Sequence, residues 1–314
     1  MHKKVALRIA SILVTCLVAA SPASAQNDTN PVWRGEKIKN YLPHMSWPEV
    51  EDLLKRTDMV ILPVGALEQH GHHLPIGTDF LNGLERAKLI AQRTDVLVAP
   101  ILMPGNSPYH LGFPGTISLS TETIQKVHVE AVQSLIHHGF KRFLILNAHG
   151  GNRVVSRYIA DRINHETAGI AVELGEAAAP FMERRELSDE PAVFDRHAGV
   201  GETSRSMYLI PSLVDMDKAV PTKLTHLDHL DKMLPEVIAG EPTALRVFLA
   251  EALKAEKTGK RTTTREMTST GVWSVRPLED ATAQRGREST EAFVLAAVQF
   301  IERWKQLRPL DATK

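Results

Sequence analysis

Short apolar runs alternate along this chain with longer stretches in which apolar residues recur at helical spacing. The runs predict strands over Met59–Val64, Val96–Pro100, Phe143–Asn147 and Ile170–Leu174. The longer stretches predict helices over Leu81–Arg93, Thr121–His138, Arg153–His165, Gly201–Leu209 and Thr290–Trp304. Strands that alternate with amphipathic helices in this way indicate an α/β fold with a largely parallel sheet.

The first 25 residues have the three parts of a secretory signal sequence. A basic start precedes the apolar run Ile9–Ala20, which is too short to span a bilayer comfortably, and Ala23-Ser-Ala25 is a typical cleavage pattern. A lipid anchor at Cys16 fits less well, because Thr15 is a poor residue before such a cysteine. We predict cleavage after Ala25 and export to the periplasm or the medium.

Cleavage would remove Cys16, the single cysteine of the sequence, and with it every disulfide, thiolate ligand and cysteine nucleophile. The loss of Lys3, Lys4 and Arg8 would leave 34 basic against 37 acidic residues, a formal charge of −3. This charge indicates no nucleic-acid partner. No other segment is long and apolar enough to cross a membrane, so we expect no membrane association after cleavage.

Residues 26–314 are predicted to form a single domain, because the sequence has no repeats and no low-complexity tract. The charged segment 221–265 interrupts the strand and helix pattern. It has a helical stretch around Leu245–Lys257 and is predicted to form a peripheral insertion or arm.

Three polar clusters carry the candidate chemistry, and the first two directly follow predicted strands. They are Glu68-Gln-His70-Gly-His72-His73 with Asp79, then Asn147-Ala-His149-Gly150-Gly151-Asn152, and then Asp195-Arg-His197 through Glu202-Thr-Ser204. The carboxyl ends of parallel strands share one edge of a sheet, so loops that are distant in sequence can meet there.

The first two clusters supply two carboxylates and two imidazoles, from Glu68, Asp79, His70 and His149. Such nitrogen and oxygen donors suit Zn²⁺ or Mn²⁺. Two adjacent cations need a bridging carboxylate, and Asp79 is the natural candidate. Two metals roughly 3.5–4 Å apart would polarise a carbonyl and lower the pKa of a bridging water enough to make hydroxide near neutral pH.

Several of the remaining polar residues have alternative roles. Glu202 could complete the coordination of a metal, shuttle the proton to a leaving nitrogen, or merely favour the dipole of the helix that begins there. His197 could orient or stabilise a tetrahedral intermediate. The glycines let the backbone pass close to metal or substrate. We predict substrate contacts for His72, His73, Gly150 and Gly151, whereas His110 fits a pocket position and a surface position equally well.

At these clusters the chain resembles the creatininase (creatinine amidohydrolase) family. The matching runs are Pro63–Asp79, Phe113–Thr116, Asn147–Asn152 and His197–Ser204, with a weaker match over Ala281–Gly286. Their order and spacing also fit, and the resemblance covers roughly residues 46–306 apart from 221–265. It implies a three-layer α/β/α fold, a centre of two divalent metal ions (zinc or manganese, with iron a further option) and assembly as a homo-oligomer, often a hexamer.

The resemblance also implies hydrolysis of non-peptide C–N bonds, chiefly of cyclic amides. Glu68, His70, Asp79 and His149 match the metal ligands of the family, with Asp79 bridging, and His197 and Glu202 match its catalytic or metal-assisting pair. Creatininase itself has a tyrosine and a metal-binding glutamate where this chain has Gly150 and Gly151. We predict that Glu202 replaces that glutamate.

Creatininase also uses tryptophans around its substrate, and the corresponding region 174–195 contains none. The predicted function is therefore that of an exported, metal-dependent amidohydrolase acting on a small amide other than creatinine. Two alternatives stay open. One is a binding protein that kept the fold and lost the chemistry, and the other is a metallo-lactonase or esterase, because the same hydroxide would attack an ester.

Overall fold

A computed structural model describes residues 35–182, 194–222, 224–225, 230–252 and 264–310. The predicted signal sequence and the last residues of the predicted helix Leu245–Lys257 lie outside these ranges. Contacts along the chain divide it into residues 1–37 and residues 38–314. The fold described below is that of the second unit.

The second unit contains helices and strands in alternation. The described helices are α1 (Trp47–Leu54), α2 (Thr78–Thr94), α3 (Thr121–His138), α4 (Arg153–Glu166), α5 (Leu174–Ala178), α6 (Val200–Leu209), α7 (Leu234–Ile238), α8 (Pro242–Ala252) and α9 (Ala283–Leu307). The strands are β1 (Met59–Val64), β2 (Leu97–Val98), β3 (Arg142–Asn147), β4 (Ile170–Glu173), β5 (Asp195–His197) and β6 (Trp273–Ser274).

The predicted parallel sheet is confirmed. Its strand order is β2-β1-β3-β4, and every neighbouring pair is parallel. Val64 pairs with Asn147 at the last position of the β1–β3 ladder, so these two strands end side by side. The loops that follow β1 and β3 therefore start from neighbouring points on one edge of the sheet.

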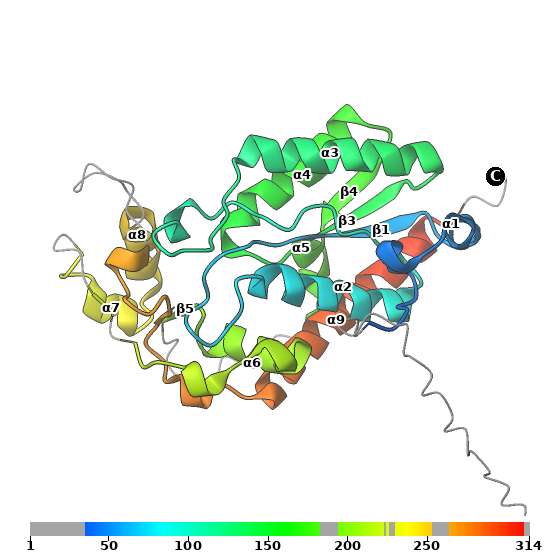
Figure 1. The fold of residues 1–314 in the computed structure, drawn as a ribbon. Coiled ribbons are helices and arrows are strands. Elements are labelled where there is room, and N and C mark those ends of the chain that lie inside the picture. The colour runs from blue at the N-terminus through cyan, green and yellow to red at the C-terminus, as the bar shows by residue number, and fades with distance from the viewer. Residues whose placement is uncertain (1–34, 183–193, 223, 226–229, 253–263, 311–314) are drawn as a thin grey trace, which may run out of the picture. The chain divides into compact units, whose positions relative to one another are not determined.

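Helices cover both faces of the sheet, which gives three layers (Figure 1). Alternate residues of β1 point to opposite faces, as the period of a strand requires. Val60 and Leu62 pack in a core with α3 and α4, whereas Met59 and Ile61 pack in a second core with α2 and α9. The predicted three-layer α/β/α architecture is confirmed.

Two helices begin earlier than the sequence pattern predicts, because their first turns are polar. The helix α2 starts at Thr78 rather than Leu81, so Asp79 lies in its first turn and not in a loop. The helix α9 starts at Ala283 rather than Thr290, and the Thr282 side chain caps it by accepting a hydrogen bond from the Arg285 N–H.

Residues of the predicted insertion contribute to a small core of their own. Phe248 of α8 packs with Phe194 and Trp273, whose ring centroids are 5.3 Å apart. Leu234 and Val237 of α7 belong to the same apolar cluster. We call this set of residues, with Leu224, Leu230, Ala244 and Met267, the aromatic cluster. The sequence pattern did not predict the antiparallel β5–β6 pair beside it, because these strands are only three and two residues long.

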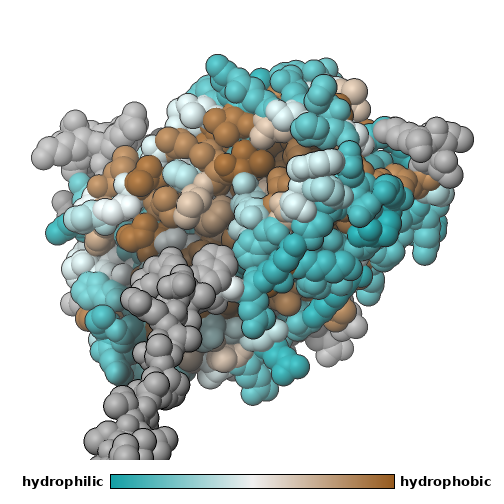
Figure 2. Space-filling view, turned by 45° about the vertical axis from the view of Figure 1, so that its right-hand side comes forward, coloured by the Kyte–Doolittle hydropathy of each residue, from teal (hydrophilic) through white to brown (hydrophobic). Residues whose placement is uncertain are grey.

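One face of the surface gathers apolar side chains between polar ones (Figure 2). A groove of about 780 Å³ between α1 and α3 is lined by residues that include Trp47, Leu135 and Phe140, and Trp47 is 73 % exposed. None of the predicted site residues lines this groove. Within the described ranges, we find no helix with the length and apolar character that a bilayer crossing requires.

Candidate metal centre

The predicted metal ligands come from three parts of the fold. Glu68 and His70 follow β1, and His149 follows the adjacent strand β3. Asp79 lies in the first turn of α2. These four side chains are almost completely buried, with exposures of 0 to 5 %. The structure therefore brings all four predicted ligands to one edge of the sheet.

The first group of donor atoms combines Glu68, Asp79 and His149. Nδ1 of His149 lies 2.9 Å from Oδ2 of Asp79 and 3.3 Å from Oε1 of Glu68. One donor atom from each of the three residues lies within 4.8 Å of the others. Two carboxylates and one imidazole at these distances can surround a single divalent cation.

The second group combines His70, Asp79 and Glu202. Nε2 of His70 lies 3.4 Å from Oδ1 of Asp79 and 3.5 Å from Oε2 of Glu202. Asp79 thus turns Oδ1 toward this group and Oδ2 toward the first group. That arrangement is the one expected of a carboxylate that bridges two cations.

Backbone carbonyls orient both imidazoles. Nε2 of His149 lies 3.1 Å from the Asn106 carbonyl, which can only accept, so Nε2–H donates and the Nδ1 lone pair faces the carboxylates. Nδ1–H of His70 donates to the Glu68 carbonyl at 3.1 Å, which leaves the Nε2 lone pair toward Asp79. Hydrogen bonds of this kind fix the tautomer of metal-binding histidines.

Several buried polar atoms of the centre have no hydrogen-bond partner within the described part of the chain. They are both carboxylate oxygens of Glu68, Nε2 of His70 and Oδ2 of Asp79. An unpaired buried polar atom costs about 1–3 kcal/mol, and most such atoms in proteins are paired. A divalent cation would satisfy these atoms, so the residues present fit a metal.

Without a cation, the carboxylates and imidazoles share protons. Burial raises the pKa of Glu68 to about 8, and His149 only partly offsets this effect. Burial lowers the pKa of His70, but the Asp79 carboxylate outweighs burial and raises that pKa to about 10. Burial also lowers the pKa of His149, but the carboxylates of Glu68 and Asp79 outweigh it and raise that pKa to about 9. A metal that binds here would displace these protons.

Glu202 is held in place by the start of α6. Its Oε2 accepts a hydrogen bond of 2.7 Å from the Ala198 N–H. Asp195 fixes the same turn by accepting from the Val200 and Gly201 N–H groups at 3.1 and 2.9 Å. Burial raises the pKa of the Glu202 carboxyl, with His70 acting in the opposite direction. The sequence-predicted position of Glu202 beside the ligands agrees with this geometry.

His197 lies over the same centre. Its Nε2–H donates to the Gln69 carbonyl at 2.6 Å, and its Nδ1 lies 3.5 Å from Oε1 of Glu68. Burial holds the pKa of His197 well below its usual range, so the ring is neutral. A neutral imidazole with a free lone pair can accept a proton.

The two other predicted histidines differ in environment. The side chain of His72 is exposed. His73 is buried, and its Nε2 lies 2.9 Å from Oγ1 of Thr203 in α6. Burial lowers the pKa of His73 to about 4, so this ring is neutral as well. The structure places His73 against Thr203, near the amino end of α6, and leaves His72 at the surface.

Gly150 and Gly151 are not equivalent. A Cβ on Gly150 would meet no atom within 4 Å. A Cβ on Gly151 would lie 2.5 Å from Nε2 of His149 and would collide with the Tyr109 hydroxyl. The Tyr109 hydroxyl lies 3.3 Å from Nε2 of His149. Tyr109 therefore occupies the space that a side chain at position 151 would need.

Sequence reasoning missed Tyr109, which lies in a segment that Asn152 holds. The Asn152 amide donates to the Gly65 carbonyl at 2.7 Å and accepts from the Asn106 N–H at 3.0 Å. It thereby links the ends of β1 and β3 to the segment that carries Tyr109. The available signal in the sequence was that Tyr109 directly precedes His110, a candidate pocket residue.

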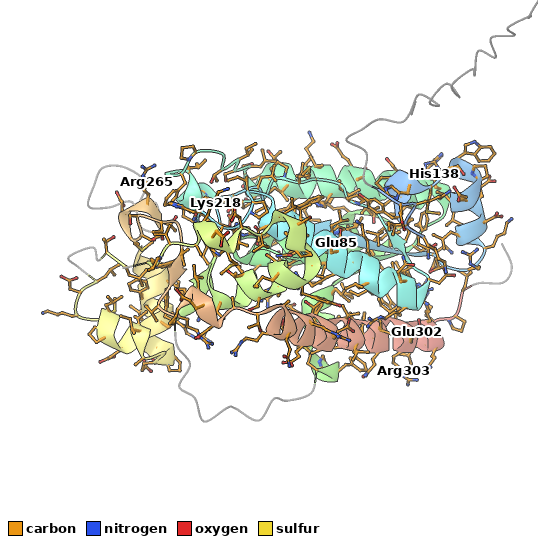
Figure 3. The ribbon with its side chains drawn as sticks, turned by 60° about the horizontal axis from the view of Figure 1, so that its bottom comes forward. Glu85, His138, Lys218, Arg265, Glu302 and Arg303 are labelled. Atoms are coloured by element: carbon orange, nitrogen blue, oxygen red, sulfur yellow. The ribbon has the colours of Figure 1, made fainter. Side chains whose placement is uncertain are left out.

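The last residue of the predicted insertion also contacts the loop after Tyr109. Arg265 donates from Nη1 to the Gly112 carbonyl at 2.9 Å, and its guanidinium lies 5.5 Å from the centre of the Phe113 ring. Figure 3 places Arg265 at the end of the molecule opposite His138. Arg265, two residues before Met267 of the aromatic cluster, therefore contacts the start of the Phe113–Thr116 motif.

A family model and two curated relatives match this chain. The family model Creatininase, described as creatinine amidohydrolase, matches residues 43–301. Creatinine amidohydrolase of Pseudomonas putida is 31 % identical over 199 residues, which cover 57 % of this chain and 75 % of that protein. The 3-dehydro-scyllo-inosose hydrolase of Thermotoga maritima is 28 % identical over 210 residues, which cover 63 % of this chain and 67 % of that protein.

Solved structures agree with the fold. A tryptophan-to-alanine mutant of creatininase has a TM-score of 0.62 at 23 % identity, and the match covers 87 % of this chain and 100 % of that one. A glutamate-to-glutamine mutant of creatininase, described as Zn-Zn type, has a TM-score of 0.58 at 22 % identity, covering 88 % and 100 %. At this identity the likeness establishes the shared architecture.

Proposed function

Because this chain belongs to the creatininase family of hydrolases, we propose that it is an exported, metal-dependent amidohydrolase that cleaves a non-peptide C–N bond of a small cyclic amide. One observation carries this proposal. Asp79 directs its two oxygens toward two separate donor groups, one with Glu68 and His149 and one with His70 and Glu202. A carboxylate shared by two cations would have this arrangement.

The proposed ligand sets follow from the two groups. Glu68, Asp79 and His149 would hold one divalent ion. His70, Asp79 and Glu202 would hold the other, since Nε2 of His70 lies beside both carboxylates. Zinc and manganese suit these donors, and iron is a third option. Bound metals supply Lewis-acid polarisation of a carbonyl and an acidified water. In this proposal Glu202 takes the place of the ligand that Gly151 lacks.

The remaining steps belong to residues of the chain itself. In this proposal Glu202 and His197 together move the proton from the attacking water to the leaving nitrogen, and Nδ1 of His197 faces the centre with a free lone pair. The Ala198 N–H fixes Oε2 of Glu202 so that the carboxylate keeps its place beside His70. The Asn106 carbonyl keeps His149 in the tautomer that presents Nδ1.

The names of the relatives indicate no single class of substrate, because another relative, 32 % identical over 173 residues, is the mycofactocin precursor peptide peptidase of Mycolicibacterium smegmatis. The two relatives described above are named for different substrates, creatinine and 3-dehydro-scyllo-inosose. Their shared feature is the family, not the molecule they act on. We therefore propose a small cyclic amide other than creatinine, since this chain lacks tryptophan over residues 174–195.

The decisive experiment measures metal content and turnover together. The purified protein is analysed by mass spectrometry for zinc, manganese and iron, then assayed with creatinine, lactams, cyclic imides and cyclic ureides alongside the matching lactones. We expect two divalent ions per chain and faster hydrolysis of the amides. Asp79→Asn should lose both the metal and the turnover.

Asp161→Asn is the matched control, because the Asp161 side chain is 62 % exposed and lies next to His165, which is also exposed. That variant should keep metal and turnover. Full activity of Asp79→Asn would refute the proposal. Tight binding of a cyclic amide without turnover in metal-loaded protein would point to a binding protein, and faster hydrolysis of the lactones would point to a lactonase.

Export and assembly are separate parts of the proposal. We propose removal of residues 1–25, residence in the periplasm or the medium, and assembly as a homo-oligomer such as a hexamer. Amino-terminal sequencing of the exported protein should begin at Gln26. Light scattering should give a multiple of the chain mass, and a monomer at micromolar concentration would exclude the oligomer.

A further inference from the structure

Two stacked imidazoles, His110 and His197, face one oxygen of Glu68. Their ring centroids are 4.0 Å apart with an interplanar angle of 27°. Nε2 of His110 and Nδ1 of His197 each lie 3.5 Å from Oε1 of Glu68. One donor atom from each residue lies within 4.8 Å of the others, so by distance alone this trio resembles a third metal site.

The side-chain amide of Gln69 has a fixed orientation beside these rings. Its Oε1 accepts from the Gly71 N–H at 3.0 Å, and its Nε2 donates to the Gly271 carbonyl at 3.0 Å. A backbone N–H only donates and a carbonyl only accepts, so the oxygen and nitrogen of the amide cannot be exchanged. Gly271 has a φ of +85°, a conformation that glycine adopts readily and that brings its carbonyl to Gln69.

This orientation determines where His110 carries its proton. The second hydrogen of the Gln69 amide points to Nδ1 of His110 at 3.2 Å, so Nδ1 must accept. The Thr264 hydroxyl lies 2.8 Å from the same nitrogen and 3.3 Å from the Tyr109 carbonyl, and it can rotate to donate to the nitrogen instead of the carbonyl. A neutral ring that accepts at Nδ1 has its proton on Nε2, the atom that faces Glu68.

The backbone carbonyl of Gln69 makes His197 a hydrogen-bond acceptor toward Glu68, the opposite of His110. The Gln69 carbonyl accepts from Nε2–H of His197 at 2.6 Å, so the lone pair of that ring is on Nδ1. His197 therefore faces Glu68 with an acceptor, and His110 faces it with a donor. Both rings have the same tautomer, but they turn different nitrogens toward the centre.

We propose that His110 is a hydrogen-bond donor of the active site, and that Gln69 holds it in this state beside the acceptor His197. A donor next to an acceptor matches an amide, whose carbonyl accepts and whose N–H donates. The trio of Glu68, His110 and His197 is then not a third metal site, because Nε2 of His110 has no free lone pair. The amide part of this inference rests on the proposed function, whereas the proton positions do not.

Nitrogen NMR of histidine-labelled protein reads the proton positions directly, without turnover. His110→Gln and His197→Gln assign the two signals. In the metal-free protein and in the zinc-loaded protein, we expect a protonated Nε2 and an unprotonated Nδ1 for His110. A protonated Nδ1 in His110 of the wild-type protein would overturn the proposal.

Gln69→Glu tests the cause, with His197 as the control inside the same molecule. The carboxylate can only accept, so His110 should move its proton to Nδ1, whereas His197 keeps its tautomer because its partner is a backbone carbonyl. Movement of both protons or of neither would contradict the role of Gln69. If this variant does not fold, the wild-type spectrum still decides the position of the His110 proton.

Zinc content and kinetics test the function of the donor. His110→Gln places an amide N–H where Nε2–H lies, and His110→Met has no donor. Both should keep the zinc content of the wild-type protein, and loss of an ion would show that His110 is a ligand. The assay uses a cyclic amide that the wild-type protein hydrolyses. His110→Met should lower kcat/KM on the order of 10²-fold, and kcat/KM of His110→Gln should be at least about tenfold higher than that of His110→Met. Equal losses in the two variants would refute the donor role.

Discussion

Strands β1 and β3 have polar side chains at both ends, and the two ends differ in how well these side chains are paired. At the amino ends, Arg142 donates from Nε to Asp58 at 2.6 Å and from Nη1 to the Arg308 carbonyl at 2.9 Å. Its guanidinium also lies 5.8 Å from the centre of the Trp304 ring. At the carboxyl ends, Glu68 has no hydrogen-bond partner for either oxygen among the described residues.

Asp95, just before β2, extends the paired region. Its carboxylate accepts from Asn40 at 2.8 Å and from Arg56 at 2.9 Å, and Lys39 lies 3.1 Å away. One sheet thus has a polar end in which charges compensate one another and a polar end in which they do not. Conflicts of the second kind are typical of functional sites, where stability is sacrificed to binding or chemistry.

Breaking the paired end should have the largest effect on stability. The Asp58 carboxylate is nearly buried, and Arg142→Met removes the cation that pairs with it. The loss of one partner of a buried ion pair lowers the free energy of unfolding by about 3–5 kcal/mol. Urea denaturation measures this loss. Metal content of the protein that remains folded should not change.

Arg162→Met is the control for that variant, because the Arg162–Glu166 pair of 2.7 Å lies on the surface of α4. Exposed pairs of this kind contribute about 0–1 kcal/mol. Similar losses in the two variants would mean that burial of the Arg142–Asp58 pair adds nothing.

Supplying a cation to the unpaired end should stabilise the protein by the next largest amount. A ligand that binds the folded state alone adds about 2.7 kcal/mol at a hundredfold excess over its Kd. Thermal unfolding with zinc and with a chelator measures the difference. Asp79→Asn should show little gain, and a gain equal to that of the wild-type protein would place the stabilising ion elsewhere.

Crowding the unpaired end should weaken metal binding by a smaller amount. In Gly151→Ala the new methyl group would press on His149 and Tyr109, and we expect metal affinity to fall about 10–100-fold, as when a residue that supports a ligand is lost. Gly150→Ala is the matched control, because its methyl group would meet no neighbour within 4 Å. Competition with a chromogenic chelator compares the two. Equal affinities would show that position 151 does not restrain His149.

Acid should affect the paired end, with the smallest effect in this series. Burial raises the pKa of Asp95, but hydrogen bonds from Arg56 and Asn40 outweigh it and hold that pKa well below its usual range. The stabilisation is therefore present above the ordinary aspartate pKa and is lost as pH falls toward the native value. Asp95→Asn should lower Tm near neutral pH and reduce the further fall in Tm below about pH 4. An unchanged acid dependence would contradict this assignment.

Local sequence patterns predicted the parts of the fold that local physics determines. The strand Met59–Val64 and the helix Thr121–His138 have the predicted bounds, because an apolar run specifies the first and a cap at each end limits the second. Ser120 accepts from the Thr123 N–H at 3.1 Å, and Gly139 ends the helix with a φ of +112°.

The sequence could not predict features that depend on tertiary packing. The predicted parallel sheet was enough to bring the loops with Glu68 and His149 to one edge, whereas the sequence did not predict that β1 and β3 are neighbours. The start of α2 was missed because Thr78 and Asp79 are polar and yet buried, which reverses the usual pattern. The donor state of His110 depends on Gly271, 202 positions from Gln69 along the chain, and no local pattern contains that contact.

The aromatic cluster has a consequence for engineering. Phe194, Phe248 and Trp273 give α7 and α8 an apolar interior distinct from the two cores that pack on the sheet. An exchange of residues 230–252 would therefore also change the packing of Phe194 and Trp273, which lie at the β5–β6 pair that carries His197. A chimaera that carries a homologue's segment would have to keep the apolar side chains that pack on these two residues.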